Sequence, residues 1–378
     1  MENKIKIAIS GAGNRSKHIV DELLKVSNRE VEIVAIFDPD KNVAQNSATN
    51  IWKTPNAKIC SSWTEALACD VNWAMIFSPN YVHKEQILEA FAAGKHVFSE
   101  KPLATKISDC HEIYKAHLAS NKLFATGFVL RYSQLYIKAK EILSSGLLGK
   151  LVSIEANENI RPQHGGYIMS NWRRLRSMAG PHILEKCCHD LDLIEWFCES
   201  IPSKISAFHS RSYFKPENKY LEDKYGKDAF ICWNDPHRLD TPFNDEADLH
   251  DNLISVAQFR NGVQVSFNCS MSSPIPERRM RFNCTEGTMY LDVYNSSLTW
   301  KNIGDNVVTT LNFSNCDGHA GGDFFIMKEL YETMTKGTAP KCSGQAGLLS
   351  AVYALAIDEA ALTEKIVDLE DVWKSLGQ

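Results

Sequence analysis

A lysine and a histidine, far apart in the sequence, are the strongest candidates for acid–base chemistry in this chain. Lys101 follows a short apolar run and precedes Pro102, which restricts the lysine to an extended backbone and helps fix where its ammonium points. His189 lies in an apolar, helix-like stretch, and imidazole titrates near neutral pH, as a reversible proton transfer requires. Glu185 precedes His189 by four residues and Asp192 follows by three, so one helix would place all three on one face. Asp192 could also serve only to orient its neighbours.

A glycine-rich segment follows the first apolar run and could bind a phosphate. It consists of Gly11, Ala12, Gly13, Asn14, Arg15 and Ser16. Two glycines allow the backbone to turn tightly and approach a pyrophosphate, and the free amides at the start of the next helix attract its negative charge. Ser16 replaces the third glycine of the usual dinucleotide pattern and is small enough for close packing of helix on strand. A plain glycine turn is the alternative.

An aspartate at the end of the second apolar run indicates which dinucleotide would bind. Asp38 stands at roughly the spacing of the acid that binds the ribose hydroxyls, and its carboxylate would repel a 2′-phosphate. The next residues, Pro39, Asp40 and Lys41, include no arginine. We therefore expect NAD rather than NADP, unless Asp38 only caps a turn before Pro39.

The elements that position these residues alternate between strands and helices in the first third of the chain. Strands are predicted at Ile5–Ser10, Val31–Phe37, Trp73–Phe77, His96–Ser99 and Phe124–Thr126, with a weaker one at Ala57–Cys60. A helix over Tyr81–Ala93 should stop at Gly94, and Ser62 and Ser108 are candidate helix caps. Such alternation predicts a parallel sheet with its chemistry at the carboxyl ends of the strands.

The pattern changes after residue 127. Helices are predicted at Ser133–Ser145, at Ile183–Phe197 and from Asp323 onward. Strands are predicted at Leu151–Asn157, Leu253–Phe259, Val263–Cys269, Met280–Cys284, Thr288–Val293 and Val307–Phe313, with a hairpin turn at Asn261 and Gly262. Residues 214–250 are polar and predict a long surface excursion. We expect two domains, 1–127 and 128–378, the second an α+β domain with a largely antiparallel sheet.

Composition excludes several classes of protein. The 378 residues are 44% hydrophobic and 23% charged, which is ordinary for a globular protein. The net charge of −5, without a long basic run, argues against nucleic acid as a partner. The 11 scattered cysteines do not suggest a disulfide framework, and neither a leader peptide nor an 18-residue apolar span is evident. A cytoplasmic protein that does not bind membranes is expected.

Five segments together resemble the Gfo/Idh/MocA family, which includes glucose–fructose oxidoreductase and inositol dehydrogenase. They are Ser78–His83, Gly94–Ala104, Gly146–Lys150, Cys188–Asp192 and His319–Asp323. The resemblance spans nearly the whole chain, and its most specific part is Glu100-Lys101-Pro102. It implies an α/β protein with an N-terminal Rossmann domain, a doubly wound parallel sheet, and a C-terminal domain with an open sheet that commonly mediates dimers or tetramers. The substrate would lie between the nicotinamide and that sheet.

The resemblance also implies roles for particular residues. Lys101 would bridge substrate and cofactor, His189 would contact the reacting hydroxyl, and the acid one turn earlier, often aspartate in the family, is Glu185 here; Lys186 could act in its place. The candidate cofactor-binding residues are Gly11, Gly13, Asn14, Arg15, Asp38, Ser78, Pro79, Asn80, His83, Glu100 and Lys101. The candidate substrate-binding residues are Lys101, Tyr167, Trp172, Arg173, Glu185, Lys186, His189 and His319.

No metal is expected, because the adjacent Cys187 and Cys188 would point about 100° apart on a helix. The leading hypothesis is an NAD-dependent dehydrogenase of a sugar or polyol. A second is an NAD-dependent glycosidase that oxidises its substrate transiently and eliminates the aglycone. A third is a non-catalytic dinucleotide sensor.

Overall fold

The computed structural model describes residues 4–231, 233, 238–314 and 321–378, which form two compact units. One unit comprises Met1–Ser133 and Asp317–Leu348, and the other comprises Gln134–Cys316 and Leu349–Gln378. The first unit is therefore built from two separate stretches of chain. The two domains predicted from the sequence, 1–127 and 128–378, do not include this second stretch of chain in the first unit.

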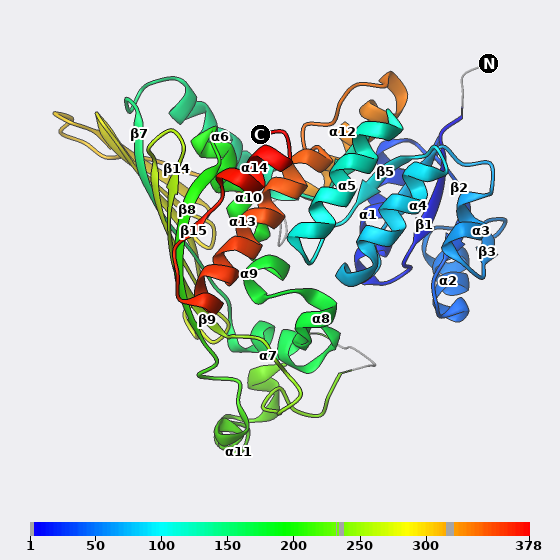
Figure 1. The fold of residues 1–378 in the computed structure, drawn as a ribbon, viewed down its shortest axis with the longest axis horizontal. Coiled ribbons are helices and arrows are strands. Elements are labelled where there is room, and N and C mark those ends of the chain that lie inside the picture. Colours follow the sequence, from blue (N-terminus) through cyan, green and yellow to red (C-terminus); the bar gives the residue numbers. More distant parts are fainter. Residues whose placement is uncertain (1–3, 232, 234–237, 315–320) are drawn as a thin grey trace. The chain divides into compact units, whose positions relative to one another are not determined.

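The first unit contains a six-stranded parallel sheet in the order β3-β2-β1-β4-β5-β6 (Figure 1). Its strands are β1 Lys6–Ser10, β2 Glu32–Phe37, β3 Lys58–Cys60, β4 Trp73–Ile76, β5 His96–Ser99 and β6 Phe124–Thr126. This is the strand order of a dinucleotide-binding Rossmann fold, and the prediction of a parallel sheet is confirmed.

The helices of this unit connect and flank the strands. They are α1 Asn14–Val26, α2 Lys41–Asn46, α3 Trp63–Leu67, α4 His83–Ala92, α5 Ile107–Ser120 and the returning α12 Gly322–Lys336, which packs against α1. Ser62 caps α3 as predicted, since its Oγ accepts the Glu65 N–H. The prediction for Ser108 is wrong, because α5 already begins at Ile107. Gly94 follows the end of α4 with a φ of +71°, which confirms the predicted stop.

The second unit contains a nine-stranded sheet in the order β14-β13-β12-β11-β7-β10-β9-β8-β15. Its strands are β7 Leu151–Asn159, β8 Pro202–Ser210, β9 Asn252–Phe259, β10 Gln264–Ser270, β11 Glu277–Cys284, β12 Gly287–Asp292, β13 Ser297–Asn302, β14 Thr309–Asn312 and β15 Val367–Asp368. β7 and β10 run parallel, and the other neighbouring pairs are antiparallel. The predicted largely antiparallel sheet is confirmed, although β8, β13 and β15 were not expected.

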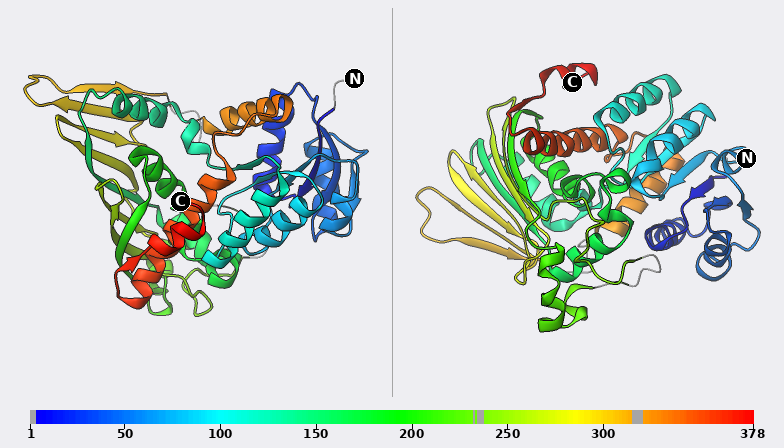
Figure 2. Two further views of the ribbon diagram at one scale, coloured as in Figure 1. Left: turned by 45° about the horizontal axis from the view of Figure 1, so that its top comes forward. Right: turned by 60° about the horizontal axis from the view of Figure 1, so that its bottom comes forward.

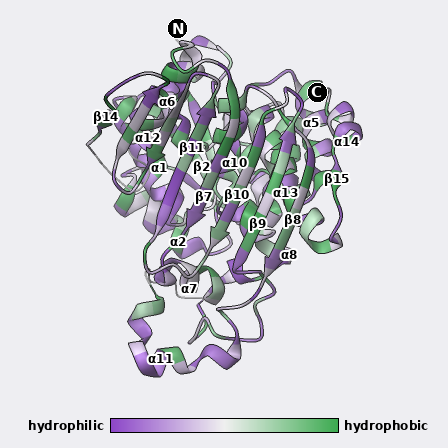
Figure 3. Ribbon diagram, turned by 90° about the vertical axis from the view of Figure 1, so that its left-hand side faces the viewer, coloured by the Kyte–Doolittle hydropathy of each residue, from purple (hydrophilic) through white to green (hydrophobic). Residues whose placement is uncertain are grey.

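One face of this sheet carries helices and the other lies open (Figures 2 and 3). On the covered face, α10 Cys188–Cys198 contacts β7, and α6 Gln134–Ser144 contacts β13. The open face carries exposed apolar side chains on neighbouring strands, with Phe208 directly opposite Ile254 and Val256 two residues further along β9. Apolar side chains therefore lie on both faces of this part of the sheet.

Two expectations for the second unit are wrong. The predicted helix Ile183–Phe197 is interrupted by a turn at Lys186 and Cys187, so α9 His182–Glu185 and α10 are separate helices. The segment 214–250 is not only a surface excursion. Its apolar side chains Phe214, Phe230, Phe243, Ala247 and Leu249 form a buried core with α7 Pro162–Ser170. Gly166 permits this packing, since a Cβ there would lie 1.8 Å from the Phe230 carbonyl oxygen.

The helix α13, Gly344–Thr363, is long and apolar enough to cross a membrane. The sequence analysis did not expect a span of this kind. However, 67% of its most apolar window is buried inside the protein. Such burial is typical of a core helix, and Tyr353 on α13 packs edge-on against Phe259 of β9.

Candidate active site

The glycine-rich turn lies at the carboxyl end of β1, where it leads into α1. The Gly11 N–H donates to the Phe37 carbonyl at 2.9 Å, and its φ of +85° is one that residues with a side chain rarely adopt. A Cβ on Gly11 would lie 2.8 Å from the carbonyl carbon of Phe77 at the end of β4. Gly13, the N-cap of α1, differs because no atom outside its own neighbourhood lies within 4 Å of the position of a Cβ. The turn therefore leaves room above Gly13 where a pyrophosphate fits.

Asp38 joins this turn to the end of β2. Its Oδ2 accepts the Ala12 N–H at 2.7 Å, and its Oδ1 accepts the Asp40 N–H at 2.9 Å. The turn-capping role considered for Asp38 is thus present. A carboxylate has about four acceptor positions, so ribose hydroxyls could still be bound.

Arg15, predicted to bind the cofactor, is partly buried and forms ion pairs with two buried carboxylates. Its Nε lies 2.7 Å from Glu100 Oε1, and its Nη2 lies 2.9 Å from Asp323 Oδ1 on the returning α12. Burial alone would lower the pKa of Arg15, but the two carboxylates outweigh it and raise the pKa above the usual value. Glu100 Oε2 also accepts the Lys101 N–H at 3.2 Å. Arg15 and Glu100 therefore hold the start of α1, the end of β5 and α12 together.

His83 connects the two loops that carry the predicted nicotinamide-side residues. Its Nε2 lies 2.7 Å from the Ser78 carbonyl oxygen, and its Nδ1 lies 2.7 Å from the Pro102 carbonyl oxygen. Both oxygens can only accept, so the ring nitrogens are the donors in these contacts, and a neutral ring donates from one nitrogen at a time. Gln86 adds a second tie, because its Oε1 accepts the hydroxyls of Ser78 at 2.7 Å and Ser10 at 3.0 Å. The segment Ser78–Asn80 and the backbone next to Lys101 are thereby fixed in the same unit.

Four of the predicted substrate-binding residues come together in the second unit. Arg173 Nε lies 2.7 Å from Glu185 Oε1, and Arg173 Nη1 donates to the Tyr167 hydroxyl at 3.2 Å. The guanidinium also lies 4.2 Å from the centre of the Trp172 ring. An aromatic face beside charged hydrogen-bonding groups is suited to a polyhydroxylated ligand. His319, the remaining loop candidate, lies outside the described residues.

His189 is buried on α10 beside a network of charges that sequence reasoning missed. Asp190 receives two hydrogen bonds of 2.8 Å from Arg278 on β11. Glu158 on β7 lies 3.4 Å from Arg278 Nη1 and 3.1 Å from Lys186 Nζ. Lys186, considered as a substitute for Glu185, therefore pairs with Glu158. Glu185, the last residue of α9, pairs with Arg173.

The two carboxyl groups of this network respond differently to burial. Burial raises the pKa of Asp190 to about 8, with Arg278 opposing and Glu158 adding to the effect. Burial also acts on Glu158, but Arg278 and Lys186 outweigh it and lower the pKa of Glu158. Two cationic groups, on Lys186 and Arg278, thus face two carboxyl groups one residue away from His189. In the sequence, the signal for this network is the charged residues of β11, a strand in which buried and more exposed residues alternate.

We expect Gly11→Ala and Gly13→Ala to separate folding from dinucleotide binding. A methyl group at Gly11 combines a left-handed backbone with a clash, so the free energy of unfolding should fall by more than about 1–2 kcal/mol. Gly13→Ala should change it by less than about 1 kcal/mol, yet its methyl group would occupy the open space and weaken NADH binding. Urea unfolding and NADH fluorescence titration measure the two effects. If Gly13→Ala binds NADH with wild-type affinity, the pyrophosphate does not bind next to Gly13.

Comparison with known families covers most of the chain. Residues 5–128 match the oxidoreductase family with an NAD-binding Rossmann fold (GFO_IDH_MocA). Residues 136–290 match the GFO/IDH/MocA C-terminal domain. The two matches follow the order of the two sheets along the chain.

Individual relatives are distant. The putative oxidoreductase YteT of Bacillus subtilis is 22% identical over 73% of this chain and 75% of its own length. Inositol 2-dehydrogenase of Gluconacetobacter diazotrophicus is 34% identical, but over only 44% of this chain and 47% of its own length. A crystal structure of levoglucosan dehydrogenase in complex with NADH and levoglucosan matches with a TM-score of 0.80 and 17% identity, covering 97% of this chain and all of that chain. That structural likeness shows the shared fold.

Proposed function

Because the chain belongs to the Gfo/Idh/MocA family of oxidoreductases, we propose that it is an NAD-dependent dehydrogenase acting on a secondary hydroxyl of a sugar or polyol. The observation that carries the substrate class is the cluster of Arg173, Glu185, Tyr167 and Trp172, which offers an aromatic face and charged hydrogen-bonding groups together. The inositol and levoglucosan dehydrogenases among the relatives support the same class. Asp38 supports NAD over NADP, because its carboxylate would repel a 2′-phosphate.

The proposed chemistry divides the work between two side chains. Bound NAD⁺ supplies the hydride acceptor. Lys101 would hydrogen-bond the reacting hydroxyl and stabilise negative charge on its oxygen, while His189 would accept the hydroxyl proton. Glu185 and Arg173 would hold neighbouring hydroxyl groups. The proton taken from the hydroxyl would stay on the imidazole until solvent removes it.

The test is to incubate the purified protein with NAD⁺ and a panel of sugars, inositols and aryl glycosides. Reduced cofactor and released aglycone are measured in parallel. Net NADH formation with a sugar or inositol supports the proposal. Aglycone release without accumulation of NADH would indicate the glycosidase reaction instead. Dinucleotide binding without either product, across the panel, would favour the non-catalytic sensor.

We further propose that the open face of the nine-stranded sheet joins copies of the chain into a homodimer or homotetramer. Phe208→Asp and Ile254→Asp, which place charges on directly opposite positions of this face, should each shift the protein to a smaller species in light scattering. Leu118→Asp on α5, also an exposed apolar position, serves as the control and should leave the mass unchanged. An unchanged mass in both sheet variants would contradict the interface.

A further inference from the structure

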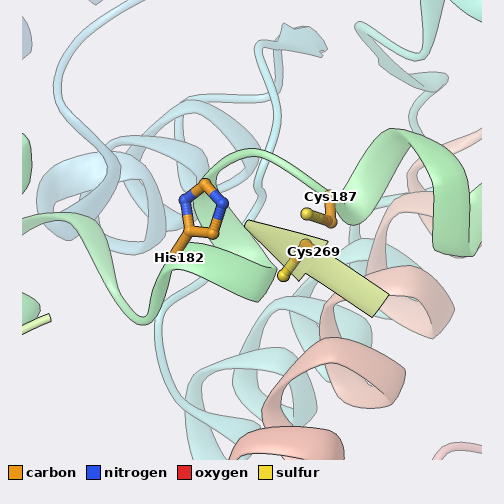
Figure 4. A group of neighbouring side chains, drawn as sticks. All are labelled: His182, Cys187 and Cys269. Carbon is orange, nitrogen blue, oxygen red and sulfur yellow. The ribbon is translucent and has the colours of Figure 1, made fainter. Parts of the chain in front are cut away.

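Three side chains with metal-binding atoms, none of them part of the Arg173 cluster, meet inside the second unit. His182 begins α9, Cys187 lies in the turn before α10, and Cys269 belongs to β10 (Figure 4). All three are buried, and their ligand atoms lie within 4.8 Å of one another. The expectation of no metal considered the adjacent pair Cys187 and Cys188. The structure instead brings a second thiol to Cys187 from a strand about 80 residues later.

We propose that His182, Cys187 and Cys269 bind a Zn²⁺ ion. Zinc prefers thiolate and imidazole ligands, and a site with two cysteines and one histidine matches this preference. Zn–S bonds of about 2.3 Å and Zn–N bonds of about 2.0–2.1 Å put the ligand atoms of a tetrahedral site about 3.4–3.8 Å apart. Side chains at up to 4.8 Å can reach this spacing by small rotations.

The histidine supplies an independent observation. His182 is 5% exposed, and among the described residues neither of its ring nitrogens has a nitrogen or oxygen hydrogen-bond partner, so the imidazole faces only the two thiols as polar neighbours of this group. An unsatisfied buried polar group costs about 1–3 kcal/mol, so such groups are uncommon without an explanation. A metal ion on one nitrogen would account for a buried imidazole in this position.

The surroundings of the two thiols shift their pKa values in opposite directions. A hydrogen bond from Cys187, helped by His182 and opposed by burial, lowers the pKa of Cys269 to about 6. Burial together with Cys269 raises the pKa of Cys187 well above its ordinary value. A metal ion would bind both sulfurs as thiolates, so its binding would release the thiol protons.

A small pocket gives this group access to a fourth ligand. His182 and Cys269 line it together with His209, His250 and Asp358. The rings of His209 and His250 stack with their centres 3.4 Å apart, and burial lowers the pKa of both, to about 4 for His250. The fourth position of the metal would be open to a ligand from this pocket, such as a water molecule.

The site would have a direct structural effect. Cys187 precedes His189 by two residues, and Cys269 lies in the middle of the sheet. A metal bridging them would anchor the start of α10 to β10. This role is independent of whether the chain is a sugar dehydrogenase.

The test uses the full-length, reduced and chelator-treated protein titrated with Co²⁺, which reports thiolate coordination through sulfur-to-metal charge-transfer absorption. We expect one equivalent to bind, to be displaced by Zn²⁺, and to raise the unfolding temperature in proportion to the logarithm of the metal concentration. Cys187→Ser, Cys269→Ser and His182→Ala should each weaken binding by more than the roughly 10–100-fold typical of changes outside the ligand set. Cys198→Ser, a buried cysteine on α10 that lies outside the group, should bind as the wild type does.

Circular dichroism of each variant without metal shows whether it folds. If one variant does not fold, the titration of the wild-type protein still tests the proposal. The absence of charge-transfer absorption in folded, reduced wild-type protein would overturn the proposal. So would equal Co²⁺ affinity in Cys198→Ser and in folded Cys187→Ser or Cys269→Ser. A disulfide between Cys187 and Cys269, formed on exposure to peroxide in protein that binds no metal, would identify a redox pair instead.

Discussion

Lys101→Met should lower kcat by roughly 10²–10⁴-fold while NADH affinity stays within a few-fold of wild type. Methionine keeps most of the length and apolar stem of lysine but removes the ammonium group. The backbone position should survive, because it depends on the Lys101 N–H bond to Glu100 and on the His83 contact with the Pro102 carbonyl. Steady-state kinetics with the sugar identified by the panel and NADH fluorescence titration measure the two quantities.

A matched control flanks the same strand, β5. Lys95, at the opposite end of the β5 segment, donates to the Val71 carbonyl, and Lys95→Met should leave kcat close to wild type. The double variant Lys101→Met with His189→Ala adds a sharper test. If both side chains act on one hydroxyl, the double variant should lose little more activity than the worse single variant. Losses that multiply would show that the two residues act independently.

Arg278→Met should lower the free energy of unfolding by about 3–5 kcal/mol. The substitution leaves Asp190 and Glu158 buried next to each other with only Lys186 to balance them, since Arg278 makes the two 2.8 Å bonds to Asp190. Urea unfolding followed by circular dichroism measures the loss. A parallel fall in kcat is expected, because Asp190 adjoins His189 on α10.

The control is Arg260→Met, which removes an exposed ion pair with Glu370 and should cost at most about 1 kcal/mol. A rescue experiment separates charge from packing. Adding Asp190→Asn and Glu158→Gln to Arg278→Met removes the uncompensated negative charges, so part of the lost stability should return. If the triple variant is no more stable than Arg278→Met, the loss comes from packing and the electrostatic explanation is wrong.

The first sheet could be predicted almost residue by residue. Each strand is a short apolar run that ends at a residue unable to continue it, such as Gly11 after β1 or Pro79 after β4. Even the three-residue β3 lies within the weak strand predicted at Ala57–Cys60. Local sequence determines these elements because a buried parallel strand needs an uninterrupted apolar run.

The errors arose where distant residues decide the structure. Nothing in the neighbouring sequence indicates that Phe214, Phe230 and Phe243, which lie in a polar segment, pack against α7. Likewise, the predicted helix Ile183–Phe197 contains no proline or glycine that would mark a break. The turn at Lys186 places Lys186 next to Glu158 on β7. For the candidate site, the sequence indicates which residue types could do the chemistry. It does not indicate that Glu158 and Arg278 pair with Lys186 and Asp190, because their strands come close only in the folded sheet.

The return of the chain to the first unit has a consequence for how the protein is made. Arg15 near the start of the chain forms its ion pair with Asp323, and α1 packs against α12. During synthesis, the strands of the second sheet up to β14 emerge from the ribosome before α12 does. The nucleotide-binding half therefore waits, incomplete and with Arg15 and Glu100 lacking their third partner, until nearly the whole polypeptide has been translated.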